Sequence, residues 1–173
     1  MKFLATLLSL AATASAIDLY LHTNNNCGDD SLRCNGLNPD TCCGFVTSSS
    51  PYQSIAVRGI PSGWNLQGRG YDGNNCNRLQ TVSGNNGNDW ICNRSNGFRY
   101  TGAGYNFVGR KRAEGAGGAA SNCQRPNALV LANGTEYDLT TLEDPEFEEL
   151  IATGFDIEKS AETSQKLQPL RIK

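Results

Sequence analysis

The sequence predicts a small, mainly β domain that is stabilised by disulfides. Apolar and polar residues alternate in short segments, which is the pattern of half-buried strands. In segment 54–58, for example, Ile55 and Val57 fall on one face. Gly, Asn and Pro residues separate these segments and favour turns. The 173-residue chain also contains seven cysteines, which is typical of a disulfide framework formed in an oxidising compartment.

The N-terminus has the composition of a secretory signal peptide. Lys2 supplies a basic start, residues 3–12 are an apolar run, and Ala14-Ser15-Ala16 is a small-residue cleavage site. All cysteines follow Ala16. No later stretch approaches the ~20 apolar residues of a membrane span. We therefore expect a secreted, extracellular protein without a transmembrane segment, whose mature chain begins near Ile17.

The composition of the chain changes near residue 112. Residues 17–112 carry nine Lys/Arg and six Asp/Glu, a balance of +3, whereas residues 113–173 carry five and eleven, a balance of −6. The dibasic pair Lys111-Arg112 marks the boundary and is a predicted processing site. The expected organisation is a signal peptide (1–16), a cysteine-rich β domain (17–112), a flexible linker (113–126), an acidic hairpin–helix tail (127–154) and a disordered C-terminus (155–173).

Several strands can be placed along the β domain. The opening strand is 17–22, and Trp64 and Leu66 share the buried face of another strand. Two further strands are expected within 97–107, with Gly102 to Gly104 as the turn between them. We expect seven or eight short strands in all, and a polar, turn-rich segment from Asp29 to Cys43.

The acidic tail has its own predicted elements. Asn133-Gly134 is a strong hairpin signal between two short apolar segments. Asp144-Pro145 then favours the start of a helix. Phe147, Leu150 and Ile151 lie at helical spacing and form its apolar face.

An internal repeat suggests how the cysteines pair. The triplet Asn-Asn-Cys ends at Cys27 and again at Cys76, 49 residues later, and Cys43 recurs as Cys92 at the same spacing. A duplication of this kind predicts the bonds Cys27–Cys43 and Cys76–Cys92. Cys34 is then left to pair with Cys42 or with Cys123. Pairing of Cys27 with Cys76 is the main alternative, because six cysteines allow fifteen connectivities.

Candidates for catalysis are few. His22 is the one histidine, and its place in the opening strand predicts an exposed side chain. There is no GxSxG motif for a nucleophile. Asp29 or Asp30 with Asp72 or Asp89 would be the remaining carboxylate pair for glycoside hydrolysis, although solvated turn residues are the commoner interpretation. With one histidine and no CxxC, we expect neither a metal site nor a cofactor.

Binding has more candidates. Tyr71 and Trp90 lie beside Asp72, Asn74 and other polar residues, and aromatic rings of this kind stack on sugars. Aromatic residues that close the ends of a β core are the alternative interpretation. Asn93 and Asn133 stand in N-glycosylation sequons.

The segment SIAVRGIPSGWNLQGRGYDGNNC at residues 54–76, with IDLYLHTNNNCG and NPDTCCGF, resembles small secreted cysteine-rich proteins of filamentous fungi. Its portion WNLQGRGYDG also resembles the Greek-key motif of βγ-crystallin domains, a fold shared by some killer toxins and plant antimicrobial proteins. The resemblance implies a Greek-key sandwich over residues 17–112. The crystallin calcium signature does not follow Asn74-Asn75 or Asn85-Asn86, so calcium binding is not expected.

These observations favour a secreted, non-enzymatic protein that acts as an effector or an antimicrobial toxin. The alternatives are a module that binds cell-wall glycans and a carbohydrate-active enzyme. The expected partner is a target-cell surface, a glycan or a host protein. Nucleic acid is not expected, because the basic residues are too sparse. We expect a monomer, with dimerisation through Cys123 as the alternative.

Overall fold

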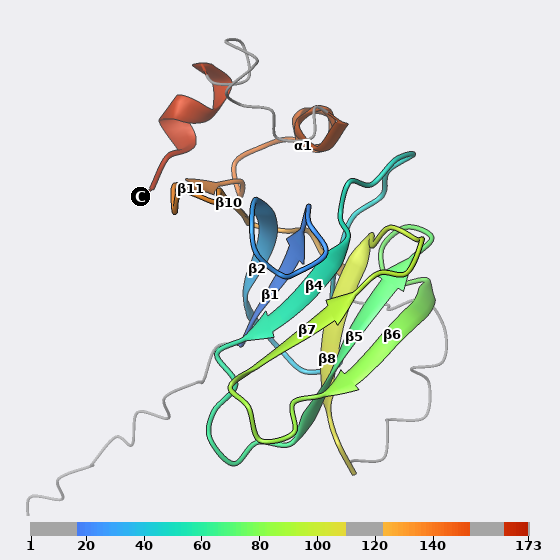
Figure 1. Cartoon of the computed structure of the whole chain (residues 1–173). Coiled ribbons are helices and arrows are strands. Elements are labelled where there is room, and N and C mark those ends of the chain that lie inside the picture. Colours follow the sequence, from blue (N-terminus) through green and yellow to red (C-terminus); the bar gives the residue numbers. More distant parts are fainter. Residues whose placement is uncertain (1–16, 110–122, 153–164, 173) are drawn as a thin grey trace, which may run out of the picture.

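The computed structural model describes residues 17–109, 123–152 and 165–172, and within them two β-sheets pack face to face (Figure 1). Sheet A contains, in order, β11 (Glu136–Asp138), β10 (Ala128–Val130), β2 (Ser31–Leu37), β1 (Ile17–His22), β4 (Ser54–Arg58) and β7 (Trp90–Arg94). Sheet B contains β6 (Arg78–Gly84), β5 (Leu66–Asp72), β8 (Gly102–Phe107), β3 (Cys42–Gly44) and β9 (Cys123–Gln124). The predicted mainly β, disulfide-stabilised sandwich is confirmed.

The sandwich is built from two Greek-key repeats that exchange a strand. In the first repeat, β2, β1 and β4 are neighbours in sheet A, whereas β3 lies in sheet B. In the second repeat, β6, β5 and β8 are neighbours in sheet B, whereas β7 lies in sheet A. The strands β1 and β5 begin 49 residues apart, at Ile17 and Leu66, which is the spacing of the sequence repeat.

The core lies between the sheets and consists of the residues that point inward at every second position along the strands. Leu19, Ile55, Val57 and Leu66 are fully buried there. Gly70 leaves room for a large ring, because a Cβ at this position would collide with the buried ring of Tyr100. The predicted inward faces of 17–22 and 54–58 are therefore confirmed. Trp64, which was expected in the strand with Leu66, lies just before β5 and packs on Phe107 with ring centroids 4.9 Å apart.

Two predictions about strands were wrong. The segment from Asp29 to Cys43, expected to be turn-rich, contains β2 and the start of β3. Residues Gly102 to Gly104 are not a turn but part of a single strand, β8. The reason is tertiary, because the loop at residues 73–77 lies directly on β8. A Cβ on Gly102 would lie 2.4 Å from the carbonyl oxygen of Asn75, so only glycine fits there.

The predicted tail is part of the sandwich instead of an appendage. The Asn133-Gly134 hairpin forms as predicted, and its strand β10 pairs antiparallel with β2, so the hairpin extends sheet A. The helix α1 (Asp144–Ala152) buries Phe147, Leu150 and Ile151, as predicted from their spacing. These residues join the same apolar core as the strands.

The expected boundaries around the tail need correction in two places. Residues 123–124, expected within the linker, form β9 beside β3. In the C-terminal segment, expected to be disordered, Leu167 is 2 % exposed, the short 3-10 helix η1 spans Gln168–Leu170, and Arg171 bridges to Tyr137. The signal peptide with Ala16 and the dibasic site Lys111-Arg112 lie outside the described residues.

The six predicted disulfide cysteines are all paired, but every predicted bond was wrong. The observed bonds are Cys27–Cys92, Cys34–Cys43 and Cys42–Cys76. The repeat itself explains the difference. Because each repeat gives its third strand to the sheet of the other repeat, the cysteine of each Asn-Asn-Cys triplet meets the third strand of the opposite repeat. Cys27–Cys92 and Cys42–Cys76 therefore both join the two repeats.

Candidate binding surface

The Asn-Asn-Cys triplets hold two equivalent loops against the outer faces of the sheets, the loop between β1 and β2 and the loop between β5 and β6. In the first repeat, the Asn25 side chain accepts a hydrogen bond from Ser95 N at 2.9 Å and donates one to Ser95 O at 3.2 Å. In the second, the Asn74 side-chain oxygen accepts a hydrogen bond from Thr47 N at 2.9 Å. Asn74, predicted as a binding residue, is thus engaged in a contact between the repeats, as its equivalent Asn25 is.

Two of the candidate catalytic carboxylates make structural contacts at separate places, Asp72 at the end of β5 and Asp30 in the loop before β2. Asp72 forms two hydrogen bonds with the Arg78 guanidinium, at 2.6 and 2.8 Å, and accepts a third from Gln80 at 3.0 Å. The Arg78 contact holds the pKa of Asp72 below its ordinary value. In the first repeat, the Asp30 carboxylate accepts a hydrogen bond from Ala132 N at 2.8 Å, which fixes the loop to the β10–β11 hairpin.

His22 is buried, which contradicts the prediction of an exposed histidine. Its side chain is 3 % exposed because the loop after β1 folds back over it. Nδ1 lies 3.3 Å from Asp29 O, whereas Nε2 is buried without a hydrogen-bond partner. Burial lowers the pKa of His22 to about 4, so the ring is neutral near pH 7.

The two aromatic residues predicted to form one sugar platform lie on different sheets. A Cβ on Gly104 would point to the outer face of sheet B and lie 3.7 Å from the Tyr71 ring, which places Tyr71 on that face. Trp90 is 46 % exposed, and its neighbour Ile91 points into the core at 4 % exposure. Trp90 therefore belongs to the outer face of sheet A. The structure does not bring the two rings together.

A different group of side chains gathers on the outer face of sheet A. Arg58 on β4 pairs across the strands with Trp90 on one side and with Asp18 on the other. Its guanidinium lies 4.9 Å from the centre of the Tyr20 ring, and it donates a hydrogen bond to Cys27 O at 2.7 Å. We call Asp18, Tyr20, Arg58 and Trp90 the sheet A row. Sequence reasoning missed Arg58 and Tyr20, although their alternation with buried Val57 and Leu19 placed them on an outer face.

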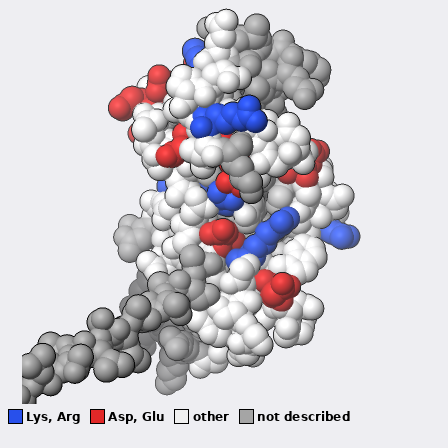
Figure 2. All heavy atoms as spheres, turned by 90° about the vertical axis from the view of Figure 1, so that its left-hand side faces the viewer, with Lys and Arg blue, Asp and Glu red and all other residues white. Residues whose placement is uncertain are grey.

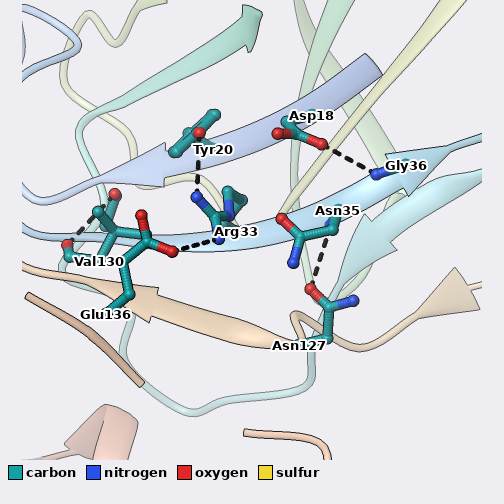
Figure 3. A network of polar contacts seen from close by, with 9 residues as sticks. Asp18, Tyr20, Arg33, Asn35, Gly36, Asn127, Val130 and Glu136 are labelled. Atoms are coloured by element: carbon teal, nitrogen blue, oxygen red, sulfur yellow. Dashed lines mark hydrogen bonds and ion pairs between the residues drawn. The ribbon is translucent and has the colours of Figure 1, made fainter. Parts of the chain in front are cut away.

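The row continues into a polar network that joins β1, β2 and the hairpin (Figure 3). Arg33 on β2 donates to the Tyr20 hydroxyl at 3.4 Å and to Glu136 on β11 at 2.8 Å. Asp18 accepts from Gly36 N at 2.9 Å, and the Asn127 side chain accepts from Asn35 N at 3.1 Å. The Arg33–Glu136 pair is mostly buried, with side chains 13 % and 19 % exposed, so the hairpin fixes this end of the face.

Charges of both signs are mixed on the face seen in Figure 2, where Lys and Arg side chains alternate with Asp and Glu among uncharged residues. Residues 17–109 carry six Arg and six Asp, so the described part of the β domain has no net charge, and the excess of +3 in residues 17–112 comes from Arg110, Lys111 and Arg112, outside the described residues. A mixed surface of this kind suits a ligand bound by several separate polar contacts more than a polyanion.

The two sequons have different environments. Asn93 is 2 % exposed and donates its side-chain N–H to Gly68 O at 3.1 Å, inside the sandwich. Because a glycan would be attached to that buried nitrogen, the prediction of Asn93 as a glycosylation site was wrong for the folded chain. Asn133 is exposed at the hairpin turn, where its side-chain oxygen accepts a hydrogen bond from Thr135 N at 2.9 Å.

Comparison with known proteins places the chain in a family. A family model for an N-terminal domain, designated ARB_05566_N, matches residues 18–127. The chain belongs to this family. The match covers β1 to β9 and ends just before the hairpin, 15 residues beyond the boundary predicted at residue 112. No curated protein and no solved structure matches the chain. A relationship to βγ-crystallins or killer toxins therefore stays a prediction.

The structure also bears on the compartment. Three disulfides are formed, which is typical of proteins that fold in an oxidising environment. Among the described residues, no helix is long and apolar enough to cross a membrane.

Proposed function

We propose that the protein is a secreted, non-enzymatic effector or antimicrobial protein that binds its target outside the cell through the sheet A row. The observation that carries this proposal is the row itself. It presents a half-exposed Trp90 beside Arg58, on a rigid sheet rather than on loops. Aromatic and Arg side chains that are fixed in this way contribute most of the energy in many interfaces.

The cross-links support an extracellular role. Cys27–Cys92 joins the loop that carries Asn25 to β7, the strand that carries Trp90. The row is therefore held in place without a ligand, which lowers the entropic cost of binding. A cross-linked sandwich of this kind also suits survival outside the cell. The engagement of Asp72 with Arg78 and of Asp30 with Ala132 N makes these carboxylates poor candidates for acid–base catalysis.

Growth inhibition of fungal and bacterial cells tests the proposal. The oxidised mature chain, residues 17–173, is compared with Trp90→Ala and Arg58→Ala variants. Tyr71→Ala is the matched control, because it removes an aromatic ring from the outer face of the other sheet. We expect Trp90→Ala and Arg58→Ala to lower potency about tenfold or more, the loss of one anchor of about 1.4 kcal/mol, and Tyr71→Ala to leave it unchanged.

Activity that is lost in Tyr71→Ala and kept in Trp90→Ala would assign binding to sheet B instead. Absence of inhibition by the oxidised chain would remove the antimicrobial form of the proposal. The effector form would then be tested by capture on plant or animal cell surfaces with the same three variants.

A module that binds cell-wall glycans is the second candidate, and the exposure of Trp90 favours it. A flat ring with Arg58 beside it on the next strand, and Asp18 beyond Arg58, resembles the surfaces that stack on pyranose rings. Sedimentation with insoluble chitin and β-1,3-glucan measures this directly. Binding that is reduced in Trp90→Ala and unchanged in Tyr71→Ala supports the glycan-binding function, whereas equal binding of both variants contradicts it.

Passage through the secretory pathway has a further consequence at Asn133. The exposed turn leaves this asparagine accessible to glycosylation, in contrast to Asn93. We expect a mass shift on enzymatic deglycosylation of protein secreted from a eukaryotic host, and no shift in an Asn133→Gln variant. A shift that persists in Asn133→Gln would place the glycan elsewhere.

A further inference from the structure

Three cysteine sulfurs meet on the outer face of sheet B. The Sγ atoms of Cys42, Cys76 and Cys123 all lie within 4.8 Å of one another. Cys42 and Cys76 are bonded to each other, whereas Cys123 is a free, exposed thiol. The free thiol therefore lies beside a disulfide, and the three atoms come from β3, from the loop at residues 73–77 and from β9.

The backbone fits more than one bond within this cluster. Cys42 and Cys123 are register partners in the parallel pair β3–β9. Neighbouring strands are about 4.8 Å apart, and disulfides span Cα separations of about 4.4–6.8 Å. A Cys42–Cys123 bond therefore needs little backbone movement. Cys76 already contacts the same site, since its Sγ is bonded to Cys42.

We propose that Cys42, Cys76 and Cys123 form a thiol–disulfide exchange centre, in which Cys123 exchanges places with Cys42 or Cys76. The Cys123 thiolate attacks one sulfur of the Cys42–Cys76 bond. A new S–S bond forms to Cys123, the old bond breaks, and its electron pair passes to the sulfur that leaves. That sulfur takes up a proton from solvent, replacing the one that Cys123 lost. No oxidant or reductant is consumed.

The other two disulfides are not part of this cluster, although Cys34 Sγ lies 3.8 Å from the backbone oxygen of Gln124 on β9. Cys34–Cys43 is fully buried between the sheets, and Cys27–Cys92 lies on the outer face of sheet A. Exchange is therefore confined to one bond. Burial raises the pKa of the Cys123 thiol, partly opposed by a hydrogen bond with the Cys76 backbone, so the thiolate fraction and the exchange rate rise with pH.

The exchange has a consequence for the cutting site predicted at Lys111-Arg112. In the Cys42–Cys76 isomer, no disulfide crosses that site. In either isomer that contains Cys123, a disulfide ties the chain after residue 122 to the first repeat or to the loop at residues 73–77. The centre thus determines whether a chain cut at this site stays covalently joined.

Differential alkylation of the full mature chain tests the centre. The native protein is incubated at pH 8.5 without reductant, acidified, alkylated and digested with pepsin at low pH, which prevents further exchange. We expect the label on Cys42 or Cys76 in a measurable fraction of molecules, together with Cys123-containing disulfide peptides. The labelled fraction should approach its final value more slowly at pH 6.

Cys123→Ser is the control, because it should show no free thiol and only the Cys42–Cys76 bond. A label confined to Cys123 after incubation at pH 8.5 would overturn the proposal. A label that also reaches Cys27, Cys34, Cys43 or Cys92 would overturn it too, because it would show general disulfide scrambling instead of a local centre.

Discussion

The two Greek-key repeats share a strand order but differ at their free edges. In the first repeat, the edge strand β2 is covered by β10 of the hairpin. In the second repeat, β6 is the edge of sheet B, and Leu79 and Val82 on it are 45 % and 44 % exposed. The first repeat is thus completed by the C-terminal segment, whereas no strand of the described residues pairs with the outer side of β6 in the second repeat. An open edge is where further strands can add.

The repeats also differ beneath their folded loops. Ser54 lies under the first loop, accepting a hydrogen bond from Cys27 N at 3.0 Å and donating one to Asn24 O at 2.7 Å. Gly102 occupies the equivalent place under the second loop, where the backbone of Asn75 approaches too closely for a side chain. The first loop is thus held by the Ser54 hydroxyl, whereas the backbone of the second loop lies directly on Gly102 and accepts a hydrogen bond from the neighbouring Thr101 hydroxyl at 3.1 Å.

The largest expected effect comes from removing one of the two disulfides that join the repeats. The Cys27→Ser/Cys92→Ser double variant opens a bond that spans 65 residues, and the chain-entropy model gives a loss of about 4 kcal/mol in the free energy of unfolding. The Cys34→Ser/Cys43→Ser variant, whose bond spans 9 residues, should lose about 2.5 kcal/mol by the same term. Denaturant unfolding measures both, and equal losses would contradict the entropic explanation.

The C-terminal segment, which includes α1, can be compared with the β6 edge by single substitutions. Phe147→Ala removes a ring that is 2 % exposed and packs on Phe45, and should cost about 3–4 kcal/mol. Leu79→Ala on the open edge should change stability by less than about 0.5 kcal/mol. Thermal and denaturant unfolding of the full mature chain measure both. A negligible cost of Phe147→Ala would show that the tail is an independent appendage after all.

The two loop supports predict effects of different origin. Gly102→Ala forces a Cβ against Asn75 and should destabilise by about 3 kcal/mol through strain. Ser54→Ala keeps the Cβ but leaves the Cys27 N–H buried and unpaired, at a cost of about 2 kcal/mol. Amide exchange at the two loops separates the variants, since each should raise exchange mainly in its own loop. Loss of protection in the other loop alone would contradict the assignment.

Titration should also distinguish the repeats, because His22 and Tyr71 occupy equivalent positions 49 residues apart. The pKa of His22 is lowered to about 4 by burial, from 6.5 in the unfolded chain. Its contribution to stability is complete above pH 6.5 and is lost as the pH falls towards 4, by about 2 kcal/mol at pH 5. His22→Gln should lack this component when unfolding is measured from pH 7.5 to 4.5. An unchanged slope would assign the pH dependence to other groups.

The local pattern of the sequence was enough to predict the buried faces of β1 and β4, the hairpin at Asn133-Gly134 and the apolar face of α1. Each depends on residues within one segment, where periodicity and turn chemistry act directly. The set of disulfide-bonded cysteines and the 49-residue repeat were also visible. Trp90 could be predicted as a binding residue from the sequence. The other residues of the sheet A row could not, because they lie on other strands and only cross-strand pairing brings them next to one another.

Only the tertiary structure determined which segments contact one another. The exchange of β3 and β7 between the sheets determines which cysteines bond, and the folded loops bury His22, occupy Asn74 and require glycine at position 102. Pairing of β10 with β2 makes the tail part of the core. These outcomes depend on close contacts between residues far apart in the chain, and such contacts leave no periodic signal in any one segment.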